Sequence, residues 1–377
     1  MKTPLSTHKV LESVQIGRVH LKNRLSVAPM TRVSATADGT PTARMIEYYR
    51  AFAVGGFGLI VTEGTYPDDR FSQGYFNQPG IVTRSHVDGW RRITDAVHEA
   101  EGVIFLQLMH AGALSQCNQT TIAPSAVKPL GAKMPEYGGT GEFPIPKAMS
   151  RLDLQQTVES FANAASRAEG AGFDGVEIHA ANGYLLDQFL TTYTNQRTDE
   201  YGGKIGNRVR FLSDVARAVR DAVSSSFVVG IRVSQTKVND LHYRWPGGKE
   251  DCEVIFPQLA AAGIDYFHVA SEGRNWLETA TIAEGLTITK LARRLTDVPV
   301  IGNGGMHELS LAEMVLSCGH ADIVSLGRGA LANPNWPNRL RNGRTFSQFE
   351  HSMIQPKATI ENTDAWLARV TERVQTI

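Results

Sequence analysis

The chain has 377 residues, 42% of them hydrophobic and 20% charged, a composition typical of a globular enzyme with a large core. Its 38 basic and 38 acidic residues give a net charge of +0, which argues against nucleic acid or an anionic membrane as a partner. The three cysteines, Cys117, Cys252 and Cys318, form no CxxC pair, so we expect no disulfide framework and no metal site. Residues 1–17 lack an apolar signal core, and no window approaches the roughly twenty apolar residues of a membrane span, so we expect a cytoplasmic protein.

Short apolar segments alternate with longer amphipathic segments along the chain. The apolar segments with the length of buried strands are residues 25–29, 59–63, 103–107, 175–179, 228–233, 266–270, 300–303 and 323–326. The clearest helical patterns are residues 84–101, 154–171, 207–223, 253–262 and 309–318, each followed by a glycine- or serine-rich turn. Strands alternating with helices predict a parallel sheet. Their number favours an α/β fold closed into a (β/α)₈ TIM barrel, with an open doubly wound sheet as the alternative.

Two segments depart from this alternation, although we expect residues 1–377 to form a single domain. Residues 111–150 are rich in glycine and proline and show no clear periodicity. A loop of this length within a compact domain is usually a functional lid or is disordered. Because it follows the third strand, it would lie at the mouth of the barrel, where active sites form. We predict an active-site lid here, with a loop of no function as the alternative, and a C-terminal extension at residues 343–377.

Several predicted strands end in large polar side chains, although barrel interiors are normally filled with Val, Ile and Leu. These polar side chains are Thr31, Glu63, Gln107, Glu177, His179 and Arg232. Burying them without partners would cost on the order of 1–3 kcal/mol each. For Glu63 and Glu177 we favour structural pairing, for example an ion pair between Glu177 and Arg232. Thr31, Gln107 and Arg232 together are better explained as a hydrogen-bonding frame for a flat polar heterocycle.

Glycine-rich turns follow the last two predicted strands. Gly304 and Gly305 come after the seventh strand, and Gly327 and Arg328 come after the eighth. In (β/α)₈ barrels these two loops often bind phosphate through backbone N–H groups, and arginine suits phosphate oxygens. The chain has no GxGxxG motif in an early βαβ unit, so we expect no Rossmann site. One phosphate and one polar heterocycle indicate a mononucleotide, and FMN fits.

The fourth strand leads into three polar side chains, His179, Asn182 and Tyr184, spaced to meet above one small ligand. His179 and Asn182 can direct donors at one oxygen, while Tyr184 can hold an acidic proton close by, since the pKa of a free tyrosine is about 10. This arrangement is typical of electrophilic activation followed by protonation. No second histidine or suitable carboxylate lies on the same turn, so we expect no metal at His179. His110 and His268 lack equally specific partners, and we interpret them as structural or pocket-lining residues.

Further segments carry a family signature: residues 28–31, 56–64, 107–110, 171–203 and 330–334. The most specific is 171–203, which contains the run Asn-Gly-Tyr-Leu-Leu-Asp-Gln-Phe-Leu. With these segments the chain resembles the Old Yellow Enzyme family of FMN-dependent NAD(P)H oxidoreductases over nearly all its length. The resemblance implies bound FMN, NADPH or NADH as hydride donor, an electrophilic alkene as substrate and a homodimer as the assembly.

The resemblance also implies which residues hold the cofactor. The first six would surround the flavin ring and the last four the phosphate: Pro29, Met30, Thr31, Gly64, Gln107, Arg232, Gly304, Gly305, Gly327 and Arg328. Thr31 would bind the carbonyl edge of the flavin and Gln107 its pyrimidine side, and Arg232 would lie beside N1 and C2. Pro29, Met30 and Gly64 would make mainly backbone contacts.

The implied reaction has two steps at one site. NAD(P)H transfers hydride to the flavin and leaves, and an activated alkene takes its place. His179 and Asn182 then polarise its carbonyl or nitro oxygen, flavin N5 delivers hydride to the β carbon, and Tyr184 protonates the α carbon. Nitro compounds, quinones or oxygen could be the main acceptors instead, and the residues do not separate NADH from NADPH.

Rival classes of barrel protein fit the sequence less well. An FMN barrel that modifies RNA would need a basic surface, which the neutral charge does not provide. A flavin-free, phosphate-binding lyase or isomerase would typically need a lysine on a strand or a metal constellation, and the predicted strands show neither.

Overall fold

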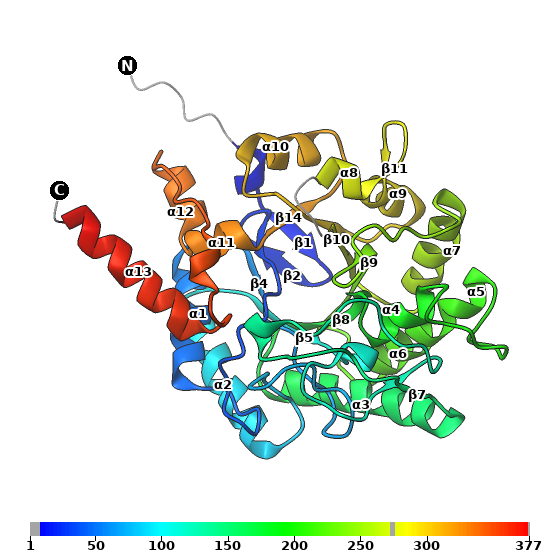
Figure 1. Cartoon of the computed structure of the whole chain (residues 1–377). Helices are drawn as coiled ribbons and strands as arrows, with labels where there is room; N and C mark the ends of the chain where they lie inside the picture. The colour runs from blue at the N-terminus through cyan, green and yellow to red at the C-terminus, as the bar shows by residue number, and fades with distance from the viewer. Residues whose placement is uncertain (1–7, 272–275, 376–377) are drawn as a thin grey trace.

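The structure, a computed structural model, describes residues 8–271 and 276–375. Parallel strands close into a barrel in which each pairs with its neighbours in chain order and the last pairs with the first (Figure 1). These strands are Leu25–Val27 (β3), Leu59–Val61 (β4), Ile104–Leu108 (β5), Gly175–Asn182 (β8), Val228–Lys237 (β9), Tyr266–Ala270 (β10), Val300–Asn303 (β13) and Ile323–Leu326 (β14). The predicted (β/α)₈ TIM barrel is therefore confirmed, and the open sheet is excluded.

Helices cover the outside of the barrel (Figure 1). The predicted helical segments correspond to Arg84–Glu99 (α2), Arg151–Gly170 (α3), Ile205–Arg208 (α5) with Arg210–Asp221 (α6), Lys249–Ala260 (α7) and Leu309–Ser317 (α10). Thr83 and Ser150 begin α2 and α3, and each side chain accepts a backbone N–H from the first turn of its helix. The prediction did not identify Ala43–Val54 (α1), Leu185–Leu190 (α4), Trp276–Ala280 (α8), Ile288–Leu295 (α9), Arg328–Ala332 (α11), Trp336–Arg341 (α12) or Ile360–Gln375 (α13).

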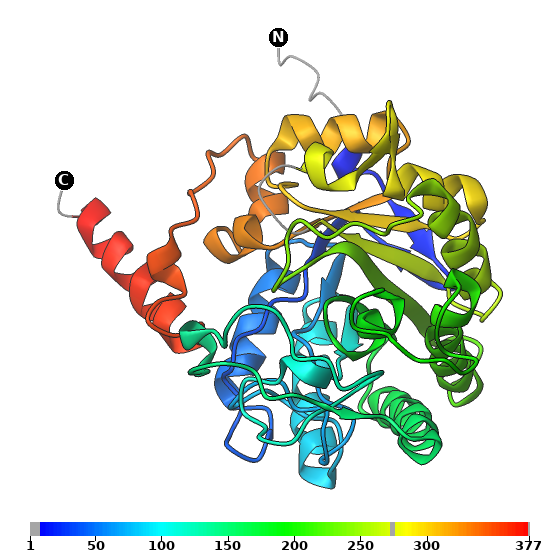
Figure 2. The same ribbon diagram turned by 45° about the vertical axis from the view of Figure 1, so that its right-hand side comes forward.

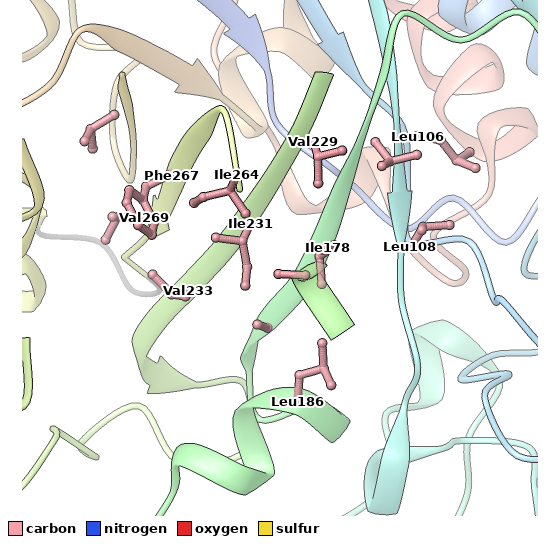
Figure 3. Close-up of a cluster of buried hydrophobic side chains, with 14 of the residues drawn as sticks. Leu106, Leu108, Ile178, Leu186, Val229, Ile231, Val233, Ile264, Phe267 and Val269 are labelled. Carbon is pink, nitrogen blue, oxygen red and sulfur yellow. The ribbon is translucent and has the colours of Figure 1, made fainter. Parts of the chain in front are cut away.

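Alternate side chains of each barrel strand face the helices or the barrel interior. The outward-facing ones form the main hydrophobic core, part of which is labelled in Figure 3: Leu106, Leu108, Ile178, Val229, Ile231, Val233, Phe267 and Val269. Inside the barrel, an apolar layer at the amino-terminal end packs against the hairpin of Val14–Ile16 (β1) and Val19–Leu21 (β2). Nearer the carboxyl ends of the strands, the inward-facing side chains become polar. The barrel is thus closed with apolar groups at one end and lined with polar groups at its mouth.

Residues 111–150 contain only short elements, as the absence of periodicity predicted. These are the 3₁₀ turns Gly112–Leu114 and Pro135–Tyr137 and the two-residue strands Ile122–Ala123 (β6) and Lys147–Ala148 (β7). The Arg197 guanidinium fastens this segment to the barrel, because it donates to the carbonyl oxygens of Pro124 at 3.1 Å and Met149 at 2.7 Å.

The C-terminal extension packs against the first strand–helix connection of the barrel. Arg32, which is 1% exposed, donates to the carbonyl oxygen of Thr359 at 2.6 Å and to the Thr363 hydroxyl. The Ile360 N–H donates to Ser34 Oγ at 2.9 Å. Figure 2 shows that α13 begins against the barrel and points away from it toward the C-terminus. None of the helices within residues 8–271 and 276–375 combines the length and hydropathy that crossing a membrane requires.

Candidate active site

The predicted site residues all lie at the mouth, because they occupy or directly follow the carboxyl ends of parallel strands. The turn with the three proposed catalytic residues is the most distinctive part. Strand β8 does not end at His179 as predicted but continues to Asn182, with a bulge between Ala180 and Asn182. Asn182 and Gly183 then have positive φ angles of 63° and 87°. This left-handed turn brings the Tyr184 ring to 5.1 Å from the His179 ring, centroid to centroid.

Tyr184 has a partner that the sequence did not reveal. Its hydroxyl hydrogen-bonds the hydroxyl of Tyr75, which also bonds Thr31. Tyr75 is 2% exposed, and burial raises its pKa well above the usual value of 10. It lies 109 residues before Tyr184 in an irregular loop after β4, so no local pattern could have paired them. The two hydroxyls place exchangeable protons beside the mouth, close to the residue that would bind the flavin carbonyl edge.

His179 is held in its neutral form. Burial lowers its pKa to about 3, and the positive charge of Arg232 lowers it further than Glu177 raises it. Its Nδ1 atom is buried and has no hydrogen-bond partner among the described residues. A neutral imidazole can donate one N–H to a substrate oxygen without adding a positive charge to the site.

Glu177 connects three strands beneath the mouth. One carboxylate oxygen accepts from Gln107 Nε2 at 2.8 Å, and the other accepts from the Tyr266 hydroxyl at 3.0 Å and His268 Nδ1 at 2.8 Å. Burial alone would raise the pKa of Glu177, but His268, Arg232 and Gln107 together lower it to about 2. The expectation that Glu177 is structurally satisfied is right, but these three residues bind it in place of the suggested pairing with Arg232. An ionised carboxylate can only accept hydrogen bonds, so the NH₂ group of Gln107 must point toward Glu177. Its carbonyl oxygen is then left to accept from another group.

Arg232 connects the other half of the mouth. It is 4% exposed, and its Nη2 donates to Asn303 Oδ1 at 3.0 Å. The Asn303 amide in turn donates to the carbonyl oxygen of Ser325 at 2.9 Å. Arg232 is therefore held by β13, which Asn303 in turn ties to β14, and the turns after these two strands were predicted to bind phosphate.

The two glycine turns differ in backbone conformation. Gly304 and Gly305 have φ angles of 133° and 69°, and a Cβ on Gly304 would lie 2.9 Å from the carbonyl oxygen of Ser271. Gly327 precedes α11, and a side chain there would meet only Met30 Sδ at 3.7 Å and Ala28 Cβ at 3.9 Å. Backbone N–H groups beside this open space can reach an anion closely.

Glu63 fixes the connection after β3. It accepts the N–H groups of Arg32 at 2.8 Å and Val33 at 3.2 Å, and the Tyr49 hydroxyl at 3.3 Å. Burial raises the pKa of Glu63 to about 7. The structural interpretation of Glu63 is therefore confirmed: its bonds hold the connection that carries Pro29, Met30 and Thr31.

A cavity of about 250 Å³ lies beside Tyr184, under the 111–150 segment. Its walls are mostly apolar and come largely from that segment: Leu114, Gln116, Gly131, Ala132, Met134 and Phe143, with Val238 and Asn239 from the loop after β9. The cavity gives an apolar molecule space next to a proton donor.

The polar mouth fits a mononucleotide. Buried polar atoms without partners among the described residues include His179 Nδ1, Ser271 Oγ and Ser325 Oγ. Since each such atom costs about 1–3 kcal/mol, they indicate that a polar ligand completes the site. Within residues 8–271 and 276–375 there is no group of three or more His, Cys, Asp or Glu residues arranged to hold a metal ion. The fold and the mouth together define a (β/α)₈ barrel protein with a nucleotide-type site and a neighbouring apolar cavity.

Comparison with known proteins identifies the family. The model of the NADH:flavin oxidoreductase / NADH oxidase family matches residues 9–346, and the chain belongs to this family. It is 37% identical over 344 residues to a probable flavin mononucleotide-dependent alkene reductase of Leishmania infantum, covering 86% of this chain and 88% of the relative.

Solved structures agree with this assignment. The Old Yellow Enzyme homologue of Zymomonas mobilis has a TM-score of 0.84 and 30% identity, covering 94% of this chain and 98% of its own. Morphinone reductase in complex with tetrahydroNAD has a TM-score of 0.80 and 33% identity, covering 90% and 92%. The predicted resemblance is confirmed, and with it a flavin-dependent NAD(P)H oxidoreductase of the Old Yellow Enzyme type.

Proposed function

We propose that this protein reduces the C=C bond of α,β-unsaturated carbonyls, maleimides and nitroalkenes, using FMN at the barrel mouth and NAD(P)H as the electron source. The observation that carries the proposal is the turn after β8, which sets Asn182 and Tyr184 beside a neutral His179 and an apolar cavity. FMN held at this mouth would supply the redox chemistry, namely hydride transfer from the nicotinamide to the β carbon of the alkene.

His179 and Asn182 activate the substrate. Their N–H groups donate to its carbonyl or nitro oxygen, where negative charge grows as the β carbon receives hydride. One well-placed donor to such an oxygen is worth roughly 2.7–4 kcal/mol. Because burial and Arg232 keep His179 neutral, this donor is available throughout the neutral pH range.

Tyr184 delivers the proton to the α carbon. A general acid in this position contributes about 10²–10⁴ in rate. The Tyr75 hydroxyl hydrogen-bonds the Tyr184 hydroxyl and so fixes its direction, and burial keeps Tyr75 itself protonated.

The residues proposed to hold FMN divide between its ring and its phosphate. The backbone of Pro29, Met30 and Gly64 would border the ring, with Thr31 at its carbonyl edge and Arg232 beside N1 and C2. Gln107 would accept from the pyrimidine N–H, because Glu177 takes its amide NH₂. The phosphate would contact the turns of Gly304, Gly305, Gly327 and Arg328, which have positive φ angles or open space beside them.

The finer organisation is part of the same proposal. Residues 1–377 form one FMN-binding domain, in which 111–150 act as a lid and 343–377 as a supporting extension. The cavity beside Tyr184 supports the proposal that residues 111–150 act as a lid, because most of the residues that line it come from this segment. A homodimer and a cytoplasmic location remain predictions, tested by light scattering of the purified protein and by cell fractionation.

The decisive experiment separates the two half-reactions. Tyr184→Phe should slow cyclic enone reduction by about 10²–10⁴, because it removes the general acid, and leave FMN reduction by NAD(P)H nearly unchanged. Anaerobic stopped-flow absorbance measures both steps on one sample. Tyr201→Phe is the matched control, since its hydroxyl bonds Asp214 away from the mouth, and it should leave both rates unchanged. Equal loss of both half-reactions in Tyr184→Phe, or loss of neither, would refute the role of Tyr184.

A further inference from the structure

A buried ion pair lies directly behind the catalytic turn. Lys237 Nζ is 2.6 Å from Asp187 Oδ1, and both side chains are 0% exposed. Asp187 is in α4, the helix that Tyr184 begins, whereas Lys237 ends β9, opposite Asn182 in the strand register. The sequence prediction missed this lysine because it ended the fifth strand at residue 233.

We propose that Lys237 and Asp187 are positioning residues for the reaction: the pair holds the left-handed turn that directs Asn182 and Tyr184 at the substrate. This inference rests on the proposed function, since it assigns a role toward those two residues. Neither member of the pair needs to touch the substrate.

The turn requires such support. An asparagine with a positive φ angle occupies a strained region that persists only when its surroundings enforce it. The backbone N–H and carbonyl groups of Asn182 and Gly183 are all hydrogen-bonded. The Asn182 N–H donates to Ser234 Oγ at 2.8 Å, and its carbonyl oxygen accepts from the Val238 N–H at 3.1 Å. The Gly183 carbonyl oxygen accepts from Gln188 Nε2 at 2.8 Å.

Asp187 supplies the remaining bond. Its second oxygen, Oδ2, accepts the Gly183 N–H at 2.6 Å, while Oδ1 faces Lys237. The carboxylate therefore bridges the turn to β9, and Lys237 determines where that carboxylate sits. The ring of Tyr243 lies 4.8 Å from Lys237 Nζ and closes the other side of the ammonium group.

Stability alone does not explain the pair. Replacing a buried ion pair by apolar groups of similar volume is often neutral or stabilising, whereas removing one partner is strongly destabilising. Burial raises the pKa of Asp187 and lowers that of Lys237, so a charge left alone would tend to be neutralised. Each single substitution therefore perturbs stability and geometry together, and only the double substitution separates the two.

The test uses Asp187→Asn with Lys237→Met, alone and combined, in the FMN-loaded protein. The double variant removes both buried charges and keeps an acceptor for the Gly183 N–H. We expect its thermal midpoint to return to within about 3 °C of wild type, because no buried charge is left without a partner. Its kcat for a cyclic enone should remain about tenfold or more below wild type, at little changed KM. The exposed pair Lys249 and Glu253, replaced by Met and Gln, is the matched control and should keep its rate.

A cycle with Tyr184→Phe identifies what the pair positions. Because the loss that runs through Tyr184 is already present in Tyr184→Phe, adding the double substitution there should lower kcat by clearly less than it does in the wild type, and the remainder acts through Asn182. A stable double variant with wild-type kcat would overturn the positioning role, as would a full additional loss on top of Tyr184→Phe. Failure of the proposed function would be recognised separately, because Tyr184→Phe alone would then leave enone reduction unchanged.

Discussion

Two buried glutamates at the mouth show how local partners set the charge of a single residue. Glu63 accepts two backbone N–H groups but has no cation bonded to it, and burial raises its pKa to about 7. Glu177 is equally buried, yet His268, Arg232 and Gln107 lower its pKa to about 2. One carboxyl therefore carries a proton up to neutral pH, while the other carries a negative charge over the same range.

The pKa of Glu63 predicts a specific pH dependence of stability. Its folded pKa of about 7 lies above the ordinary value of 4.5, so the folded state binds more protons between these values. The free energy of unfolding should therefore fall as pH rises through this window, by on the order of 3 kcal/mol from this group. In Glu63→Gln this part of the pH dependence should be absent. Urea unfolding of both proteins at pH 4 and pH 8 measures the change in the free energy of unfolding. The same pH slope in both proteins would contradict the prediction.

At this scale the sequence could point only to candidate residues that lie within a few positions of one another. His179, Asn182 and Tyr184 fall in one short run after a strand, so their convergence follows from local geometry. Tyr75 and Lys237 could not be found this way, because their partners lie 109 and 50 residues away. Only the closed barrel brings each pair into contact.

At the scale of secondary structure, the hydrophobicity of the sequence predicted the strands that are apolar on both faces. All of the barrel strands were located, but β8 and β9 extend further than predicted, to Asn182 and Lys237. In β9 the added residues, 234–237, are polar and follow the apolar run that ends at Val233, whereas in β8 the added residues Ala180, Ala181 and Asn182 follow the polar His179. The ladder continues because backbone pairing does not depend on side-chain polarity. Helix α9 was missed because it has only eight residues, too few for a clear helical period.

Glu177 joins β5, β8 and β10, so its charge should matter for the barrel as an assembly of strands. Its folded pKa of about 2 lies below the ordinary 4.5, so its contribution is complete above pH 4.5 and is lost as pH falls toward 2. Glu177→Gln should therefore be less stable than wild type at pH 6. The gap should narrow at pH 3 by on the order of 2 kcal/mol, because the unfolded wild-type chain binds a proton at Glu177 there while the folded state stays ionised.

Urea unfolding of both proteins at pH 6 and pH 3 tests this prediction. Glu159→Gln, on the exposed face of α3, is the control and should show almost no difference at either pH. A gap that stays constant or widens on acidification would show that the Glu177 charge does not stabilise the three strands.

At the scale of the whole molecule, the C-terminal extension packs against the connection that follows β3, the first strand of the barrel. The buried Arg32 guanidinium binds Thr359 and Thr363, more than 300 residues away along the sequence. Met353 and Trp366 pack against Leu331 in α11, the short helix that begins with Arg328, and Met30 contacts the same cluster. The sequence marked this region only as an extension, because contacts at such separation leave no local pattern. The extension touches both the ring end and the phosphate end of the proposed FMN site.

Removing the extension should therefore weaken FMN binding although no residue of it is proposed to touch the cofactor. Deleting residues 343–377 should raise the FMN dissociation constant about tenfold or more, because the connection holding Met30 and Thr31 loses its anchor. Arg32→Met should give part of this loss in the intact chain, by removing the guanidinium that donates to the Thr359 carbonyl oxygen and the Thr363 hydroxyl. Fluorescence titration of deflavinated protein with FMN measures both changes.

The control for this comparison is Arg44→Ala. Arg44 also reaches the extension, through Asp364 at 2.9 Å, but both side chains are about half exposed, at 48% and 51%. Exposed ion pairs contribute about 0–1 kcal/mol, so FMN affinity should change by less than about threefold. If Arg32→Met bound FMN as tightly as Arg44→Ala, the contact of Arg32 with the extension would have no effect on FMN affinity. The extension would then support only the outer surface of α1.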